Sequence, residues 1–145
     1  TAVGDVDRLP PAVQRTLNQG VYATRGLDSM RLTLALSYGG RDEITRAVRR
    51  VVTEVYSGIL PIDGITESLI SERLDTAGTP DPDLVIRTSG EARISNFLLW
   101  QSAYSEYEFI DTLWPDFTPE EFAKVCAGFA ARGSGRALPP PSPPP

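Results

Sequence analysis

One stretch decides the fold of this chain: Asp83-Leu84-Val85-Ile86-Arg87-Thr88-Ser89-Gly90-Glu91-Ala92-Arg93-Ile94-Ser95-Asn96-Phe97. Residues 84–86 are apolar without interruption, as expected of a strand that is buried on both faces of a parallel sheet. Ligands of such sheets bind beyond the carboxyl ends of the strands, which is where Arg87 and Arg93 would lie. Two guanidinium groups, neighbouring hydroxyls and the start of a following helix would together receive a diphosphate. The stretch therefore predicts a phosphate-binding enzyme.

Outward from this stretch, the spacing of apolar residues predicts alternating helices and strands. The predicted helices cover about residues 10–24, 42–56, 67–74, 95–104 and 119–131, and the predicted strands cover 31–36, 84–86 and 109–113. The last helix opens with a capping box, Thr118-Pro119-Glu120-Glu121. This alternation is typical of an α/β fold, a parallel sheet with helices on both faces.

The chain is expected to form one domain over residues 1–132, followed by a tail. Residues 133–145 are rich in Gly and Pro and cannot build a core, so the tail is expected to be disordered and polyproline-like. A proline-rich docking peptide is the alternative for this segment.

Composition excludes several classes of function. The net charge is −5, and a nucleic-acid partner would favour a basic face. A single cysteine, Cys126, and the absence of histidine exclude a disulfide framework, a Cys/His zinc site and a histidine-based triad within this chain. We expect Cys126 to lie in the core. With no signal peptide or membrane-spanning run in the sequence, the cytoplasm is the expected location. The first residue, Thr1, indicates a piece of a longer protein.

Several motifs, taken together and in order, carry a family resemblance. They are Tyr38-Gly39-Gly40-Arg41, the stretch 83–91, Arg93-Ile94-Ser95-Asn96-Phe97-Leu98-Leu99-Trp100-Gln101, Ala103-Tyr104-Ser105-Glu106 and Leu113-Trp114-Pro115-Asp116-Phe117. Over about residues 3–131 the chain resembles the cis-prenyltransferases, and more narrowly the C-terminal part of a bacterial undecaprenyl diphosphate synthase. The resemblance implies an incomplete version of that fold.

The resemblance also implies a reaction and a set of site residues. Members of the family add isopentenyl diphosphate units to an allylic diphosphate such as farnesyl diphosphate, with Mg²⁺ as cofactor, and make cis-polyprenyl diphosphates. The positions matching Arg87, Arg93 and Ser95 bind isopentenyl diphosphate, and the position matching Glu106 belongs to the metal site. The resemblance further implies a homodimer whose product is a membrane lipid, with at most peripheral membrane contact.

Each of these residues also has a structural interpretation. An arginine after a strand often pairs with a surface carboxylate, which applies to Arg87 and Arg93 alike. Ser95 could cap the predicted helix at 95–104, a role that is compatible with phosphate binding. Glu91 is expected to orient an arginine rather than to bind a ligand, and Glu106 could simply be exposed at a helix end.

The family's N-terminal Asp-Gly-Asn-Gly motif, its histidine and its Ser-x-Glu-Asn-Trp segment do not occur in this sequence. In the family this aspartate binds magnesium and is needed for ionising the allylic substrate, so the isolated chain is expected to be inactive. No catalytic residue is assigned here. Two alternatives remain: a non-catalytic partner or regulatory subunit of a heteromeric cis-prenyltransferase, and an unrelated phosphate-binding α/β module.

Overall fold

A computed structural model describes residues 1–133 of the chain, which divide into two compact units. The first unit comprises residues 1–79 and 96–100, and the second comprises residues 80–95 and 101–133. Both combine parallel strands with helices, so the predicted α/β class is confirmed. The expected tail lies outside the described residues except for Gly133. Within residues 1–133, no helix is both long enough and apolar enough to cross a bilayer.

The first unit begins with a short parallel strand pair. Strand β1 (Ala2–Val3) pairs with β2 (Leu34–Ala35), and helix α1 (Pro11–Thr24) lies between them in the sequence. The helix predicted at 10–24 is thus confirmed, with proline at its first position. The strand predicted at 31–36 is reduced to two residues.

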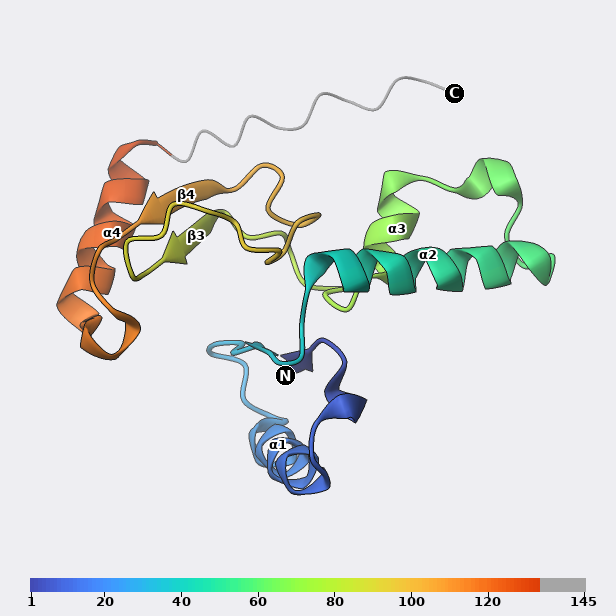
Figure 1. Ribbon diagram of the computed structural model, residues 1–145, viewed down its shortest axis with the longest axis horizontal. Coiled ribbons are helices and arrows are strands. Elements are labelled where there is room, and N and C mark those ends of the chain that lie inside the picture. The colour runs from blue at the N-terminus through green and yellow to red at the C-terminus, as the bar shows by residue number, and fades with distance from the viewer. Residues whose placement is uncertain (134–145) are drawn as a thin grey trace. The chain divides into compact units, whose positions relative to one another are not determined.

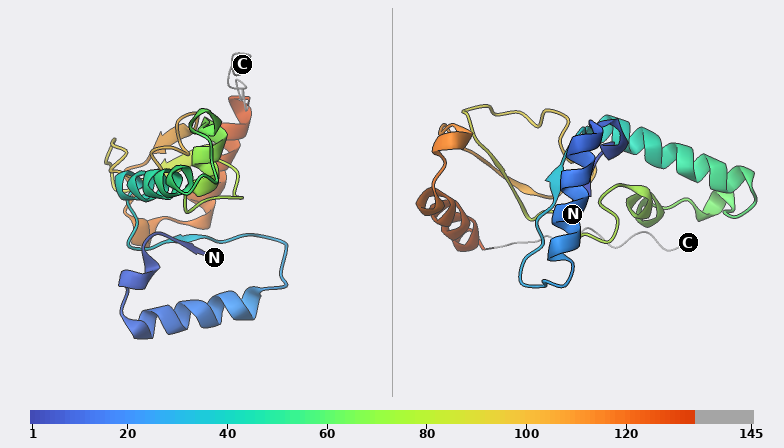
Figure 2. Two further views of the ribbon diagram at one scale, coloured as in Figure 1. Left: turned by 90° about the vertical axis from the view of Figure 1, so that its right-hand side faces the viewer. Right: turned by 90° about the horizontal axis from the view of Figure 1, so that it is seen from below.

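Two further helices complete this unit. Helix α2 (Gly40–Tyr56) and helix α3 (Glu67–Arg73) lie side by side, with the 3₁₀ turn η2 (Ile62–Gly64) between them in the sequence (Figures 1 and 2). The buried face of α2 is formed by Glu43, Ala47 and Val51, which recur at a spacing of four residues. Two apolar residues of the same helix, Val48 and Val52, are exposed.

The second unit is built on a parallel pair of longer strands. Strand β3 (Leu84–Arg87) and strand β4 (Glu106–Phe109) lie side by side (Figure 1). In their parallel pairing Leu84 lies opposite Glu106 and Arg87 opposite Phe109. The 3₁₀ turn η3 (Trp114–Asp116) leads to helix α4 (Pro119–Ala131). The Thr118 hydroxyl accepts a hydrogen bond from the backbone N–H of Glu121, which confirms the predicted cap of α4.

Two predicted elements are wrong. The strand predicted at 109–113 lies earlier, at 106–109, where charged and aromatic residues alternate. Residues 95–104 form turns instead of a helix. Ser95, Asn96 and Leu98 have φ angles of 50°, 63° and 44°, a left-handed conformation that breaks the helical path.

Candidate diphosphate site

Arg87 is the last residue of β3, and the loop that follows is fixed by backbone hydrogen bonds. The N–H groups of Ser89 and Gly90 donate to the carbonyls of Thr112 and Ile110, each at 2.9 Å. Both donors have left-handed φ angles, 75° for Ser89 and 68° for Gly90, so the chain turns sharply there. A Cβ on Gly90 would lie 3.2 Å from the Asp111 carboxylate, and its positive φ also favours glycine. The turn returns residues 91–93 toward the end of β3.

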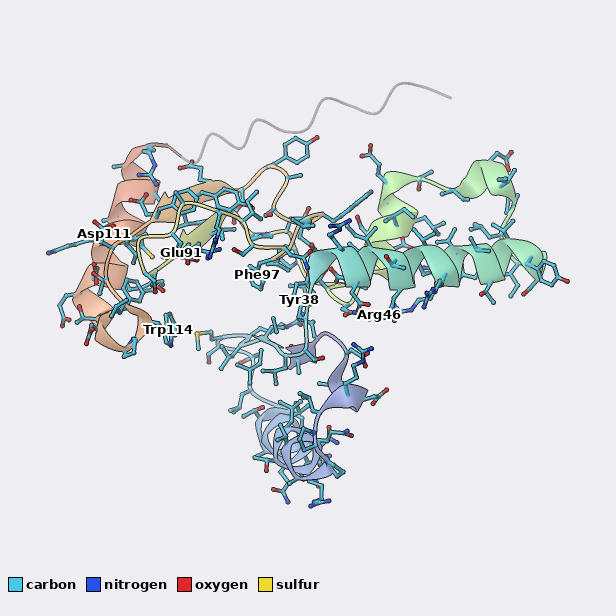
Figure 3. The ribbon with its side chains drawn as sticks, in the orientation of Figure 1. Tyr38, Arg46, Glu91, Phe97, Asp111 and Trp114 are labelled. Carbon is cyan, nitrogen blue, oxygen red and sulfur yellow. The ribbon has the colours of Figure 1, made fainter. Side chains whose placement is uncertain are left out.

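This turn brings both predicted arginines onto one carboxylate. Arg87 Nη2 donates to Glu91 Oε2, while Arg93 donates from Nη2 to Glu91 Oε1 at 2.7 Å and from Nε to Oε2 at 3.2 Å. Arg87 Nη1 also donates to the backbone carbonyl of Arg93 at 2.6 Å. Glu91 therefore contacts two arginines where the sequence suggested one. Figure 3 labels Glu91 in the loop after β3 and Asp111 in the neighbouring loop after β4.

The electrostatics of this cluster favour an anion. The hydrogen bond from Arg87 lowers the pKa of Glu91, and the bonds and charge of Arg93 add to the effect, although partial desolvation opposes it. Two guanidinium groups against one carboxylate leave an excess of positive charge. Arg93 is also well exposed, with 68% of its side-chain surface accessible, so an anion can reach it. The cluster has the donors and charge that a diphosphate requires.

Ser95 closes the same loop at an exposed position. Its left-handed φ of 50° and the turns that follow rule out the predicted role as the N-cap of a helix over 95–104. The hydroxyl lies two residues after Arg93 in the sequence, on the loop that carries the arginine cluster.

Glu106, the predicted metal ligand, is the first residue of β4 rather than the end of a helix. Its carboxylate accepts a hydrogen bond from Arg132 Nε at 2.9 Å, and Glu108 accepts one from Arg132 Nη2 at 3.1 Å. These contacts raise the pKa of Arg132, led by the hydrogen bond to Glu106. Among residues 1–133 there is no group of three or more acidic, His or Cys side chains suited to a metal. A single carboxylate such as that of Glu106 is a suitable ligand type for Mg²⁺, which usually binds through one or two carboxylates together with phosphate oxygens and water.

A residue that the sequence reasoning missed is Asn96, in the first unit. Its backbone carbonyl accepts the N–H of Gly40 at 2.7 Å, and its Oδ1 accepts the N–H of Arg41 at 2.9 Å. Asn96 therefore caps α2 from a distant point of the chain, in place of the local Ser, Thr or Asp that usually does so. The sequence feature that could have indicated this role is the Gly39-Gly40 start of α2, because no local side chain is present there to cap the helix.

The Tyr38-Gly39-Gly40-Arg41 motif is closely packed. A Cβ on Gly40 would lie 2.8 Å from Leu99 Cγ, and the Tyr38 and Phe97 rings meet edge to face with centroids 5.8 Å apart (Figure 3). Among the aromatic residues of the quoted motifs, Trp100 and Phe117 are half-buried, whereas Trp114 is 72% exposed.

Comparison with known proteins identifies the family. Residues 1–135 match the family model described as "Putative undecaprenyl diphosphate synthase". The isoprenyl transferase of Geobacter sulfurreducens is 48% identical over 130 residues, covering 90% of this chain and 53% of that protein. The isoprenyl transferase of Porphyromonas gingivalis is 52% identical over 131 residues, covering 90% of this chain and 52% of that protein. The chain spans about half the length of the curated relatives it matches.

Solved structures agree with this match. Lavandulyl diphosphate synthase from Lavandula x intermedia, in complex with dimethylallyl diphosphate, superimposes with a TM-score of 0.86 at 37% identity, covering 89% of this chain and 56% of that one. A probable undecaprenyl diphosphate synthase from Campylobacter jejuni gives a TM-score of 0.75 at 36% identity, covering 90% of this chain and 58% of that one. The fold, the motifs and these matches together place the chain in the undecaprenyl diphosphate synthase family of isoprenyl transferases.

Proposed function

We propose that this chain carries the isopentenyl diphosphate side of an isoprenyl transferase active site. The observation that supports the proposal most directly is the convergence of Arg87 and Arg93 on one carboxylate in the loop after β3. Guanidinium groups bind phosphate oxygens through paired, charge-assisted hydrogen bonds, and they do so more specifically than ammonium groups. The relatives are isoprenyl transferases, and transfer of a prenyl group from a diphosphate calls for a diphosphate site of this kind.

In this proposal each residue has a distinct task. Arg87 and Arg93 hold the diphosphate of isopentenyl diphosphate, and the Ser95 hydroxyl donates a further hydrogen bond to it. Glu106 would contribute one carboxylate to Mg²⁺, and the ion, when bound, would supply positive charge against the phosphate oxygens. Arg132 must loosen its hold on Glu106 for that role. In the proposed reaction the double bond of isopentenyl diphosphate attacks the allylic carbon, the allylic diphosphate leaves, and a proton is lost as the new cis double bond forms.

Calorimetric titration of the 145-residue chain with isopentenyl diphosphate tests the binding role. Arg87→Ala and Arg93→Ala should each weaken binding by about 2–5 kcal/mol, because each removes a charged contact to the ligand. Arg49→Ala removes an exposed arginine from α2 and serves as the control for charge alone. Equal affinities of the Arg87 and Arg49 variants would show that the loop does not hold the diphosphate.

Activity is best tested in a chimera that restores the length of the relatives. Residues 3–132 would replace the matching part of the Geobacter sulfurreducens isoprenyl transferase, to which this chain is 48% identical. The chimera should incorporate labelled isopentenyl diphosphate into polyprenyl products in the presence of Mg²⁺, and Glu106→Gln should raise the Mg²⁺ concentration that it requires. A folded chimera that binds isopentenyl diphosphate without extending any allylic diphosphate would argue for the non-catalytic partner role instead.

A further inference from the structure

The arginines that would hold the diphosphate are already occupied by a group of similar chemistry. Both oxygens of the Glu91 carboxylate accept hydrogen bonds, Oε1 from Arg93 and Oε2 from Arg87 and Arg93. A carboxylate and a terminal phosphate group both present oxygens to the paired N–H groups of a guanidinium. The contacts of Glu91 are thus those expected of a bound phosphate.

We propose that Glu91 is an internal stand-in for the diphosphate, a positioning residue that holds Arg87 and Arg93 together until a diphosphate group displaces its carboxylate. The inference deepens the proposed function, because it assumes that these two arginines are the diphosphate ligands.

The backbone around Glu91 allows this exchange without rearrangement of the loop. The bonds from Ser89 to Thr112 and from Gly90 to Ile110 fix the chain just before Glu91 and involve no atom of its side chain. The Glu91 side chain is 43% exposed, so it can rotate into water when its place is taken. Arg87 meanwhile keeps its bond to the Arg93 carbonyl, so one of the two guanidinium groups stays in position during the exchange.

Displacement is required because the two anions cannot share the same donors. Arg93 uses Nε and Nη2 on Glu91, and Arg87 uses Nη2. A diphosphate that engaged these N–H groups while Glu91 stayed in place would bring like charges together, which is unfavourable. The carboxylate therefore lowers the affinity for diphosphate while it keeps the well-exposed Arg93 ordered for binding.

The charge of Glu91 can be removed while its shape is kept. In Glu91→Gln the competing charge is lost and the neutral amide can still accept a hydrogen bond, so inorganic pyrophosphate should bind about fivefold or more tightly than to the wild-type chain in calorimetric titration. Glu108→Gln is the matched control, since it removes a carboxylate from an arginine pair in the same unit, on Arg132. Its pyrophosphate affinity should stay within about twofold of wild type. Circular dichroism and urea midpoints establish that all variants fold.

A second measurement separates a stand-in from a merely structural residue. The N–H resonance of Arg93 Nε, followed by NMR, reports the bond to Glu91 directly. In ligand-free Glu91→Gln this signal should exchange faster with water, and saturating pyrophosphate should restore its protection. Pyrophosphate is expected to restore the protection of this N–H group only if it takes the place of the Glu91 carboxylate.

The outcomes distinguish this inference from the proposed function. Unchanged or weaker pyrophosphate binding by folded Glu91→Gln, with Arg87→Ala still defective, overturns the stand-in role and leaves the proposed function in place. Failure of both the wild type and Glu91→Gln to bind pyrophosphate overturns the proposed function and the inference with it. Tighter binding by Glu91→Gln together with restored protection at Arg93 supports both.

Discussion

The guanidinium of Arg46 holds the Asp75 carboxylate through two parallel hydrogen bonds, from Nη1 to Oδ1 at 2.7 Å and from Nη2 to Oδ2 at 2.6 Å. Asp75 also accepts the backbone N–H of Gly4 at 3.1 Å, and its own N–H donates to the buried Glu43 carboxylate at 2.9 Å. Asp75 therefore joins the segment after β1, helix α2 and the segment after α3. Its partner on α2, Arg46, is labelled in Figure 3. Three segments of the first unit are thus linked through the hydrogen bonds of a single aspartate.

Asp75→Asn should destabilise the chain by about 1.5–3 kcal/mol, because it breaks charge-assisted bonds that are largely shielded from water. Asp42→Asn removes the exposed partner of the same arginine and should cost less than about 1 kcal/mol. Urea unfolding monitored by circular dichroism compares the two variants. Similar losses for both would mean that the Asp75 pairing adds nothing beyond a surface ion pair.

The same residue predicts a pH dependence. Although burial opposes it, the hydrogen bonds and charge of Arg46 lower the pKa of Asp75 below its ordinary value. The unfolded chain therefore takes up this proton first as the pH falls, and the stabilisation that is present above about pH 4 is lost below it. Urea midpoints measured from pH 6 to pH 3 should fall less steeply for Asp75→Asn than for the wild type. Parallel slopes would contradict the assignment.

Asn96→Ala should destabilise the chain by about 0.5–2 kcal/mol, because it removes the side-chain cap from the N–H of Arg41. Asn96→Asp keeps an acceptor oxygen and adds a negative charge at the positive end of α2, so it should retain most of the stability. Thermal unfolding of both variants provides the measurement. An aspartate variant as unstable as the alanine variant would show that Oδ1 is not what matters at this position.

Two glycine substitutions should have opposite effects. Gly40→Ala places a methyl group 2.8 Å from Leu99 Cγ and 3.1 Å from the Leu99 backbone nitrogen, so it should destabilise the chain by about 1–3 kcal/mol. A methyl group on Gly20, within α1, would meet no heavy atom within 4 Å, so Gly20→Ala should stabilise the chain by about 0.5–1 kcal/mol. Urea unfolding decides both, and a neutral Gly40→Ala would mean that the two segments are not closely packed.

The elements predicted correctly are those that are determined by residues close to them in the sequence. The start of helix α4 follows from its capping box, which runs from Thr118 to Glu121, and the start of α1 follows from its opening prolines, because caps and fixed φ angles act within one turn. The segment 95–104 could not be predicted in this way. Asn96 adopts a left-handed conformation and contacts Gly40 and Arg41. These contacts are with residues far away in the sequence, so a local pattern does not reveal them.

The candidate site shows the same division. The positions of Arg87 and Arg93 after an apolar strand were readable, because the end of a parallel strand is a predictable location. The contact of both arginines with Glu91 could not be predicted. It depends on a turn that is held by the hydrogen bonds from Ser89 and Gly90 to the segment after β4. Strand β4 itself was misplaced, although the alternation of Glu106, Tyr107, Glu108 and Phe109 has the period of a strand.

Residues 88–105 are also the crossover that allows β3 and β4 to pair in parallel, and in this chain turns take the place of the helix that usually fills such a connection. The length of the loop that carries Arg93 is consequently tied to the folding of the sheet. Doubling a flexible connection adds only roughly 0.6 kcal/mol of closure entropy, so insertions would be tolerated by the pairing. Deletions are different: they would shorten the reach between two strands whose register is already set, so the strand pairing and the position of Arg93 would be lost together.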